Sequence, residues 1–352
     1  MRHAACWAVM LGAAAGAFGA SDVDYFDEAG TAVVRASGEI LDETSTELVL
    51  KTDNEELRIP AYRIEAVRYD KQPQEMLNIR NIENQNRYED AVKEYEALLP
   101  QIDPTLQEFL HAAVRYAIFK NLAAAGMVDA AKLKPAIDWY EKNAESLAAT
   151  RHFYPMTELA GRLYMAAEDY AKADEAFLKL KGVNWPGYKE KATLYQGLAA
   201  LQRGKPVDAV LSFDDVLKSN VDSPVVREQK RIAKIAKADA LVLSNKPADA
   251  EKLVREAIDE LSLEDRVNYL ARARNTLGDA LAAQKREKEA VLDGYMWVHV
   301  LYNTDPNEHA RAVYNLARLF DKIGYPDRAQ QMAELLRTEF GRTQWAKKAG
   351  GA

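Results

Sequence analysis

The fold is decided by a twenty-residue pattern that reads ARARNTLGDALAAQKREKEA from Ala271 and ARAVYNLARLFDKIGYPDRA from Ala310. Three further segments align with these two without gaps. They are YPMTELAGRLYMAAEDYAKA from Tyr154, EKATLYQGLAALQRGKPVDA from Glu190 and RIAKIAKADALVLSNKPADA from Arg231. Apolar residues recur in each segment at the spacing of a helix, and self-similarity of this kind is typical of repeat proteins. The sequence therefore predicts a mainly helical array.

The aligned columns hold the residue types that two packed helices require. The eighth column is always Gly or Ala, as needed where two helices cross closely, and the eleventh is mostly large and apolar. A turn follows, and proline after the turn suits the first turn of a second helix. The eighth column contains Gly161, Gly197, Ala238, Gly278 and Ala317, the twentieth contains Ala173, Ala209, Ala250, Ala290 and Ala329, and the turns contain Gly204, Asn245 and Gly324 followed by Pro206, Pro247 and Pro326.

This order of small residue, bulky residue, turn and small residue resembles the tetratricopeptide repeat. The first helix of that family carries Leu-Gly-x-x-Tyr, matched here by Ala160-Gly161-x-x-Tyr164 and Leu277-Gly278-x-x-Leu281. The second helix carries Ala-x-x-x-Phe, matched by Ala173 to Phe177 and Ala209 to Phe213. The marker alanine recurs at 91, 136, 173, 209, 250, 290 and 329. These steps exceed the usual spacing of about 34 residues, so longer helices or loops are expected.

The resemblance covers roughly residues 75–342 and implies a right-handed α-solenoid of about six or seven helical hairpins over residues 73–345, followed by a frayed tail at 346–352. It also implies a non-catalytic scaffold that binds a protein or peptide partner in its concave groove. The unit around Ala136 and Tyr140 aligns only with an insertion or a longer first helix. A generic antiparallel helical array is the alternative fold.

Residues 21–72 form a different region, predicted to be a small antiparallel β module. The runs 31–34, 47–51, 57–59 and 64–69 are rich in β-forming residues, with turns predicted at Ser37-Gly38, 42–45 and 53–55. Short strands at this spacing favour an antiparallel meander or a small barrel, and the region is similar to small Sm-like or SH3-like barrels. It holds 13 acidic and 6 basic residues between Asp22 and Lys71. This net charge of −7 favours either a docking surface for a basic partner or solvated strand faces that prevent edge aggregation.

Residues 1–20 have the features of a secretory signal. Met1-Arg2-His3 precedes an apolar stretch from Ala4 to about Ala17, and cleavage is expected after Ala17 or Ala20. The single cysteine, Cys6, lies within this segment, so the mature chain would hold no disulfide, thiol nucleophile or cysteine-ligated zinc. We therefore expect an exported protein of the periplasm or cell envelope of a bacterium.

Composition and motifs exclude several classes of function. The 352 residues carry 47 basic and 54 acidic side chains, and a net charge of −7 argues against a protein that coats nucleic acid. No apolar run is long enough to span a bilayer, and no nucleophile, phosphate-binding or metal-binding motif occurs. We expect no enzyme activity, cofactor or metal site. Trp185, in a loop sequence with Pro186 and Gly187, is the one tryptophan expected to face solvent.

The binding residues of a tetratricopeptide-like groove lie on the first helix of each hairpin, away from the packing columns. In the last two units this implies Arg272, Asn275 and Asp279, followed by Arg311, Tyr314 and Arg318. Two arginines one repeat apart suit a carboxylate or phosphate, so a glycan or anionic small molecule is the alternative ligand. Ion pairing between repeats, for example of Arg318 with Asp279, is the structural alternative for these charges.

Overall fold

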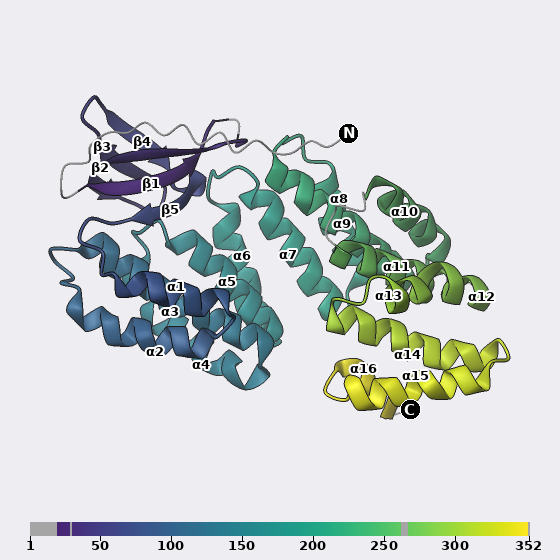
Figure 1. The fold of residues 1–352 in the computed structure, drawn as a ribbon. Coiled ribbons are helices and arrows are strands. Elements are labelled where there is room, and N and C mark those ends of the chain that lie inside the picture. Colours follow the sequence, from purple (N-terminus) through teal and green to yellow (C-terminus); the bar gives the residue numbers. More distant parts are fainter. Residues whose placement is uncertain (1–19, 29, 262–266, 351–352) are drawn as a thin grey trace, which may run out of the picture. The chain divides into compact units, whose positions relative to one another are not determined.

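The computed structural model describes residues 20–28, 30–261 and 267–350. The chain divides into two compact units, one ending at Ala167 and the other beginning at Glu168. The predicted signal segment lies outside the described residues, apart from Ala20. Figure 1 shows a small sheet packed on helices in the first unit, and helices throughout the second.

The first unit opens with a five-stranded antiparallel sheet. Its strand order is β4-β3-β2-β1-β5, and every neighbouring pair is antiparallel. A single 3-10 turn, Ala61–Arg63, joins the last two strands. The sheet confirms the predicted β module and adds a first strand that the sequence did not predict. The strands are β1 (Ser21–Phe26), β2 (Val33–Glu43), β3 (Glu47–Lys51), β4 (Glu56–Pro60) and β5 (Ile64–Arg68).

The turn predicted at Ser37-Gly38 is wrong, because both residues lie within β2. A Cβ atom on Gly38 would lie 2.2 Å from the backbone oxygen of Lys51 on β3. Glycine is therefore required for a close approach of two strands, and not for a change of chain direction. The register of β2 against β3 shifts between Ile40 and Asp42, where the strand has a bulge.

The sheet and the first helices share one hydrophobic core. Val23, Leu48 and Leu50 of the sheet are fully buried and cluster with Tyr95 of α2 and Val114 of α3. The β module therefore docks on the first hairpin and is not a separate domain. The long helix α3 accounts for the longer spacing around Ala136. The helices of this unit are α1 (Glu75–Asn84), α2 (Tyr88–Leu98), α3 (Glu108–Val128), α4 (Leu133–Asn143) and α5 (Phe153–Ala166), with 3-10 turns at Leu99–Gln101, Ala130–Lys132 and Glu145–Leu147.

The second unit is helical throughout its described residues. Helices α8, α10 and α15 begin at Pro206, Pro247 and Pro326, as the sequence predicts. Helix α16 includes part of the segment 346–352 expected to be frayed. The elements are α6 (Tyr170–Lys181), α7 (Tyr188–Gln202), α8 (Pro206–Leu217), α9 (Pro224–Leu243), α10 (Pro247–Glu260), α11 (Val267–Ala283), α12 (Glu287–Glu289), a π-helix (Ala290–Tyr295), α13 (Met296–Val300), α14 (Pro306–Lys322), α15 (Pro326–Glu339) and α16 (Gln344–Gly350).

The turn between the two helices of a hairpin has the same backbone conformation in each aligned segment. The fifteenth column adopts positive φ, which favours glycine because other residues place Cβ against the backbone there. This conserved geometry supports the repeat register independently of side chains. The residues are Glu168, Gly204, Asn245, Lys285 and Gly324, with φ between 58° and 88°.

Small residues of the eighth column face bulky residues of the second helix. A Cβ atom on Gly197 would lie 2.6 Å from the ring of Phe213, and one on Gly278 would lie 2.6 Å from the ring of Tyr295. Phe213 occupies the twenty-fourth column, whereas Gly294 occupies it in the later segment. The π-helix adds one residue to the turn, and this brings Tyr295 to the place of Gly294.

Candidate functional site

The two arginines predicted for the groove are paired with carboxylates of neighbouring helices. Arg272 of α11 lies 3.1 Å from Asp239 of α9. Arg311 of α14 lies 2.5 Å from Asp279 of α11 and 3.0 Å from Asp239. Arginine in the second column thus bonds to aspartate in the ninth column of the preceding repeat. These four residues, with Glu308, are called the inter-repeat cluster below.

Burial and neighbouring charges have opposite effects on the pKa values in the inter-repeat cluster, and the charges prevail. Only 12% of the Arg311 side chain and 13% of the Asp239 side chain are exposed. Burial alone would lower the pKa of Arg311, but the carboxylates of Asp279, Asp239 and Glu308 raise it well above its usual value. Burial would raise the pKa of Asp239, but the two guanidinium groups lower it. Both charges therefore persist across the neutral pH range.

Neutral donors complete the hydrogen bonding of these carboxylates. Tyr295 donates to Asp279 at 2.5 Å, and burial followed by the charge of Asp279 raises the pKa of this tyrosine well above its usual value. Thr276 donates to Asp239 at 2.6 Å. Asn275, predicted as a binding residue, has no exposed surface and donates to Glu308 at 2.7 Å. The cluster therefore joins repeats, and its arginines do not present open guanidinium groups to a ligand.

The structural alternative, ion pairing between repeats, is correct for these arginines. The example given for it is wrong, because Asp279 pairs with Arg311 and not with Arg318. Asp239, which bonds to both arginines, was not among the predicted residues. The available signal was the alignment itself, because Asp239 and Asp279 share the ninth column while Arg272 and Arg311 share the second. Trp185 does not face solvent, since it is 6% exposed and packs edge-on against Tyr188.

The remaining two predicted residues lie at the C-terminal end of the array. Tyr314 is buried beside Trp345 of α16, with ring centroids 5.6 Å apart. Arg318 is exposed, and its guanidinium lies 5.3 Å from the Tyr314 ring. Helix α16 therefore covers part of the wall on which binding was predicted, and Arg318 is the exposed member of the six.

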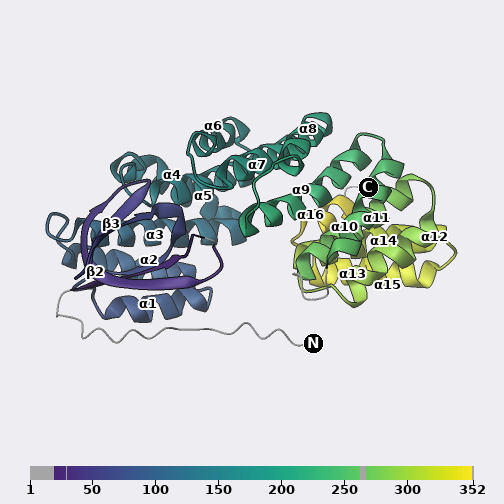
Figure 2. The same cartoon turned by 90° about the horizontal axis from the view of Figure 1, so that it is seen from above.

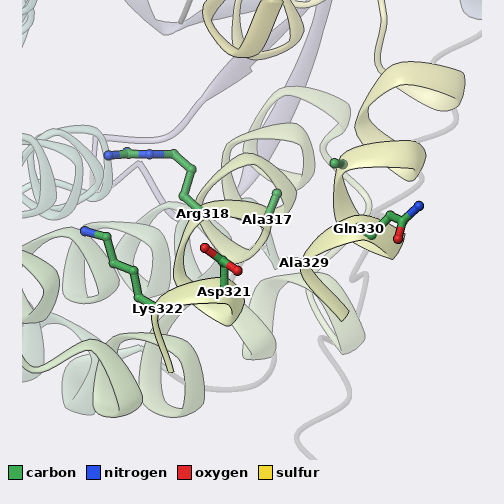
Figure 3. A pocket seen from close by; sticks show the side chains of 7 residues that line it. Ala317, Arg318, Asp321, Lys322, Ala329 and Gln330 are labelled. Carbon is green, nitrogen blue, oxygen red and sulfur yellow. The ribbon is translucent and has the colours of Figure 1, made fainter. Parts of the chain in front are cut away.

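A hollow of about 460 Å³ lies between α14 and α15 (Figure 3). Figure 2 shows these two helices side by side near the end of the chain. Arg318 and Lys322 extend from α14 in the same direction, and both are exposed. We call this the terminal hollow, and its lining residues are Ala317, Arg318, Asp321, Lys322, Ala329, Gln330 and Ala333.

The first unit contains a second buried group of charges, here called the sheet–helix cluster. Glu43 at the end of β2 has no exposed side-chain surface and lies 3.1 Å from Arg151, which precedes α5. Tyr69 donates to Glu43 at 2.9 Å and accepts from Arg151 at 3.1 Å. His152 stacks on Tyr116 with ring centroids 4.6 Å apart. These contacts fasten the sheet to the helices.

Burial governs protonation in the sheet–helix cluster. Burial raises the pKa of Glu43, with Arg151 and Tyr69 opposing the shift. Burial, followed by the charge of Arg151, holds the pKa of His152 well below its usual value. His152 is therefore neutral at neutral pH. Glu43 has no exposed side-chain surface and His152 has 4%, whereas 16% of the Arg151 side chain is exposed.

Two histidines that the sequence separates by a turn also meet. His299 Nδ1 lies 2.9 Å from His309 Nε2, joining α13 to α14. Within the described residues, no group of three or more His, Cys, Asp or Glu side chains is arranged to hold a metal ion. Across the same described ranges, no helix combines the length and apolarity that a membrane span requires.

Comparison with known proteins gives a fold but no sequence relative. No model of a protein family matches the chain, and none of the curated proteins compared matches its sequence. A tetratricopeptide repeat protein from Parabacteroides merdae matches the structure with a TM-score of 0.53 and 15% identity, over 74% of this chain and 89% of that one. The fold is tetratricopeptide-repeat-like.

A second solved structure supports the same fold. The apo form of the quorum sensor NprR from B. thuringiensis matches with a TM-score of 0.50 and 14% identity, over 72% of this chain and 71% of that one. The sequence prediction of a tetratricopeptide-like helical solenoid preceded by a small antiparallel sheet is thus confirmed.

Proposed function

We propose that this protein is a non-catalytic scaffold, exported to the bacterial periplasm or cell envelope, that binds a protein or peptide partner on its tetratricopeptide-like array. The observation that carries the proposal is the stack of helical hairpins itself, a fold it shares with solved tetratricopeptide repeat proteins. Such arrays present long surfaces made of side chains from successive repeats. The acids that converge in the array are neutralised by arginines, which gives them no role as an acid–base pair.

The paired state of Arg272 and Arg311 weighs against the alternative of a glycan or anionic small-molecule module. A ligand carboxylate or phosphate would have to displace Asp239 or Asp279 from a largely buried guanidinium. Breaking a buried ion pair is costly because it leaves a charge uncompensated. The scaffold proposal needs no such exchange, since exposed side chains such as Arg318 and Lys322 are available at the surface.

Position-specific photo-crosslinking in a bacterial envelope tests the scaffold. A photoreactive amino acid is placed at Arg318 on α14 and, in a matched variant, at exposed Lys252 on the separate α8–α10 surface. A discrete protein adduct from one position and its absence from the other would support a defined binding face. The proposal fails if neither position, nor a scan of the remaining exposed helix positions, gives a discrete adduct.

Export is tested separately, because it rests on the sequence of residues 1–20 alone. Osmotic-shock fractionation should release the protein, and N-terminal sequencing should begin at Phe18 or Ser21. An intact N-terminus that begins at Met1, recovered with the cytoplasmic fraction, would refute export and leave the scaffold proposal standing.

A further inference from the structure

The last hairpin departs from the packing rule of the hairpins before it. In two of those hairpins a small residue in the eighth column meets an aromatic ring of the second helix, as Gly197 meets Phe213 and Gly278 meets Tyr295, and the α9–α10 hairpin has Val254 at the twenty-fourth column. In the last hairpin the eighth column is Ala317 and the twenty-fourth is Ala333. The bulky side chain is missing, and the terminal hollow opens where it would lie.

Packing between repeats indicates what shape fits the hollow. Where the array supplies the bulky Phe213, the next helix, α9, faces it with small residues, and Ala233, Ala236 and Ala240 share its cluster. Protein interiors fill space at near-constant density, so a bulky residue on one side requires small ones on the other. At the terminal hollow the array supplies the small residues. A helix that packs there must supply the bulky side chain.

Helix α16 shows that this face accepts a helix. It covers the half of the α14–α15 face formed by Ala310, Val313 and Leu336, where Trp345 and Ala346 pack. Ala317 follows one turn after Val313 on α14, and Ala333 precedes Leu336 by one turn on α15. The terminal hollow is therefore the uncovered continuation of a surface on which a helix already packs.

The charge around the hollow favours an acidic occupant. The lining of the hollow contains Arg318, Lys322 and Asp321, a net charge of +1, and residues 310–350 together contain eight Arg or Lys and four Asp or Glu, a net charge of +4 in a chain that carries −7. Arg318 and Lys322 flank the α14 side of the hollow (Figure 3). No ion pair joins either cation to another side chain of the described residues. Complementary charge of this kind orients a partner and raises its association rate.

We propose that the terminal hollow binds an amphipathic helix of a partner protein, which inserts one bulky apolar side chain between Ala317, Ala329 and Ala333 and places acidic side chains beside Arg318 and Lys322. This site deepens the proposed scaffold function and rests on it. The partner helix takes the place that the next repeat would occupy, so recognition uses the same packing that joins the hairpins to one another.

A synthetic helix tests the site on the full chain. The probe is an alanine-based peptide of about 16 residues, long enough to populate helix in water, with one central Phe flanked by Glu three and four positions away. Fluorescence anisotropy should show saturable binding. Replacing the Phe of the probe with Ala should weaken binding by about tenfold or more, since a buried aromatic side chain is lost. Replacing its Glu residues with Lys should also weaken binding.

Two variants of the protein identify the place of binding. Ala333→Phe introduces the residue that the α7–α8 hairpin carries at this column, Phe213, so it should fill the hollow, preserve the fold and abolish binding. The matched variant Ala333→Ser keeps the hollow open and should bind as the wild type does. Arg318→Glu combined with Lys322→Glu should reverse the preference to the Lys probe. Thermal unfolding of each variant shows that loss of binding is not loss of folding.

The proposal is overturned if no probe binds, if the Phe and Ala probes bind equally, or if Ala333→Phe binds as tightly as Ala333→Ser. A dimer of the full chain that Ala333→Phe abolishes would also overturn it, because the occupant would then be a second copy. If the photo-crosslinked partner persists in Ala333→Phe, the scaffold function stands and the hollow is not its site.

Discussion

The inter-repeat cluster and the sheet–helix cluster both bury an arginine against carboxylate, yet they arise from the sequence in different ways. Arg311, Asp239 and Asp279 sit at equivalent columns of successive repeats, so the ion pairs follow from the repeat. Glu43 meets Arg151 only because a strand end and a helix-connecting loop come together. A repeat therefore places long-range ion pairs at regular intervals in the sequence, whereas the junction of a sheet and a helix has no repeated pattern from which to infer a contact.

The largest expected effect is at Arg311. Arg311→Ala leaves Asp239 and Asp279 buried close together without their shared cation, and it should cost about 3–5 kcal/mol in urea denaturation of the full chain. Arg272→Ala should cost less, about 1 kcal/mol, because 29% of that side chain is exposed and screened by solvent. Arg318→Ala is the matched control and should change stability by less than about 0.5 kcal/mol. Equal losses of stability in all three variants would contradict the distinction between arginines of the inter-repeat cluster and an arginine on the surface.

Because Arg272 and Arg311 hold neighbouring repeats together, they are unsuitable positions for testing partner binding. A partner lost by the double variant Arg272→Ala/Arg311→Ala would report loosened repeats as readily as a missing contact. Substitutions at exposed Arg318 and Lys322 separate the two effects, since neither pairs within the inter-repeat cluster.

Arg151→Ala tests the sheet–helix cluster in the same manner. It leaves the buried Glu43 carboxylate with Tyr69 and neutral His152 but no cation, and a cost of about 3 kcal/mol is expected. Hydrogen exchange followed by mass spectrometry should show faster exchange in β2 and β5, with α9, α11 and α14 unchanged. Arg115→Ala, which removes a partly exposed arginine of the same unit, provides the comparison. Faster exchange in both units would contradict two independent clusters.

The two clusters should also differ in the pH at which they stop contributing to the stability of the fold, and the sheet–helix cluster should respond first through His152. The folded state lowers the pKa of His152 from 6.5, so the unfolded chain binds more protons below about pH 6.5. Stability is therefore lost as pH falls through that value, by up to about 1.4 kcal/mol per pH unit for one such histidine. His152→Gln should flatten this part of the profile between pH 7.5 and 5.5. An unchanged slope would show that His152 is not buried and neutral in solution.

The inter-repeat cluster should lose its contribution to stability only at lower pH, when Asp239 becomes protonated. Arg311 and Arg272 hold the pKa of Asp239 below 3.8, despite the opposing effect of burial. Its contribution is present above pH 3.8 and is lost as pH falls through the lowered value. The contribution of Asp239 should therefore be lost at lower pH than that of His152, and Asp239→Asn should remove it.

The smallest expected effect concerns the turns, which carry the repeat pattern in the backbone. Lys285 adopts a φ of 61°, whereas Gly204 adopts 68° at the same column. Lys285→Gly should stabilise the fold by about 0.5–1 kcal/mol, and Gly204→Ala should destabilise it by a similar amount. Thermal unfolding of the pair measures both. The same sign for both variants would refute an equivalent left-handed turn in each repeat.

The features that the sequence predicts correctly are those that recur in each repeat. The eighth and twentieth columns and the prolines at 206, 247 and 326 predict the hairpins, and the second and ninth columns contain the ion pairs. Gly38 misleads because glycine serves turns and close strand contacts alike, and only its neighbour Lys51 distinguishes them. The prediction that Trp185 faces solvent is wrong because the burial of a loop residue depends on which other parts of the chain pack over it, and the local sequence does not show this.

The candidate site is likewise predicted in part, because its positions recur in the repeats but its contacts depend on the folded chain. The sequence places the groove residues on the first helices, but it does not show that Arg272 and Arg311 are already paired. The terminal hollow is also visible as Ala317 and Ala333 in their columns, although its openness depends on where α16 stops.

The sheet–helix cluster has a consequence for the order in which the molecule is assembled. All five strands are complete once Arg68 has been synthesised, so the sheet can pair early. The phenol of Tyr69, however, bonds to a guanidinium 82 residues further along the chain. Until that residue emerges from the ribosome or the export channel, the Glu43 carboxylate lacks its cation. A chain that ends before Arg151 would therefore hold a loosely anchored sheet, and released chains ending on either side of Arg151 should differ in their resistance to protease.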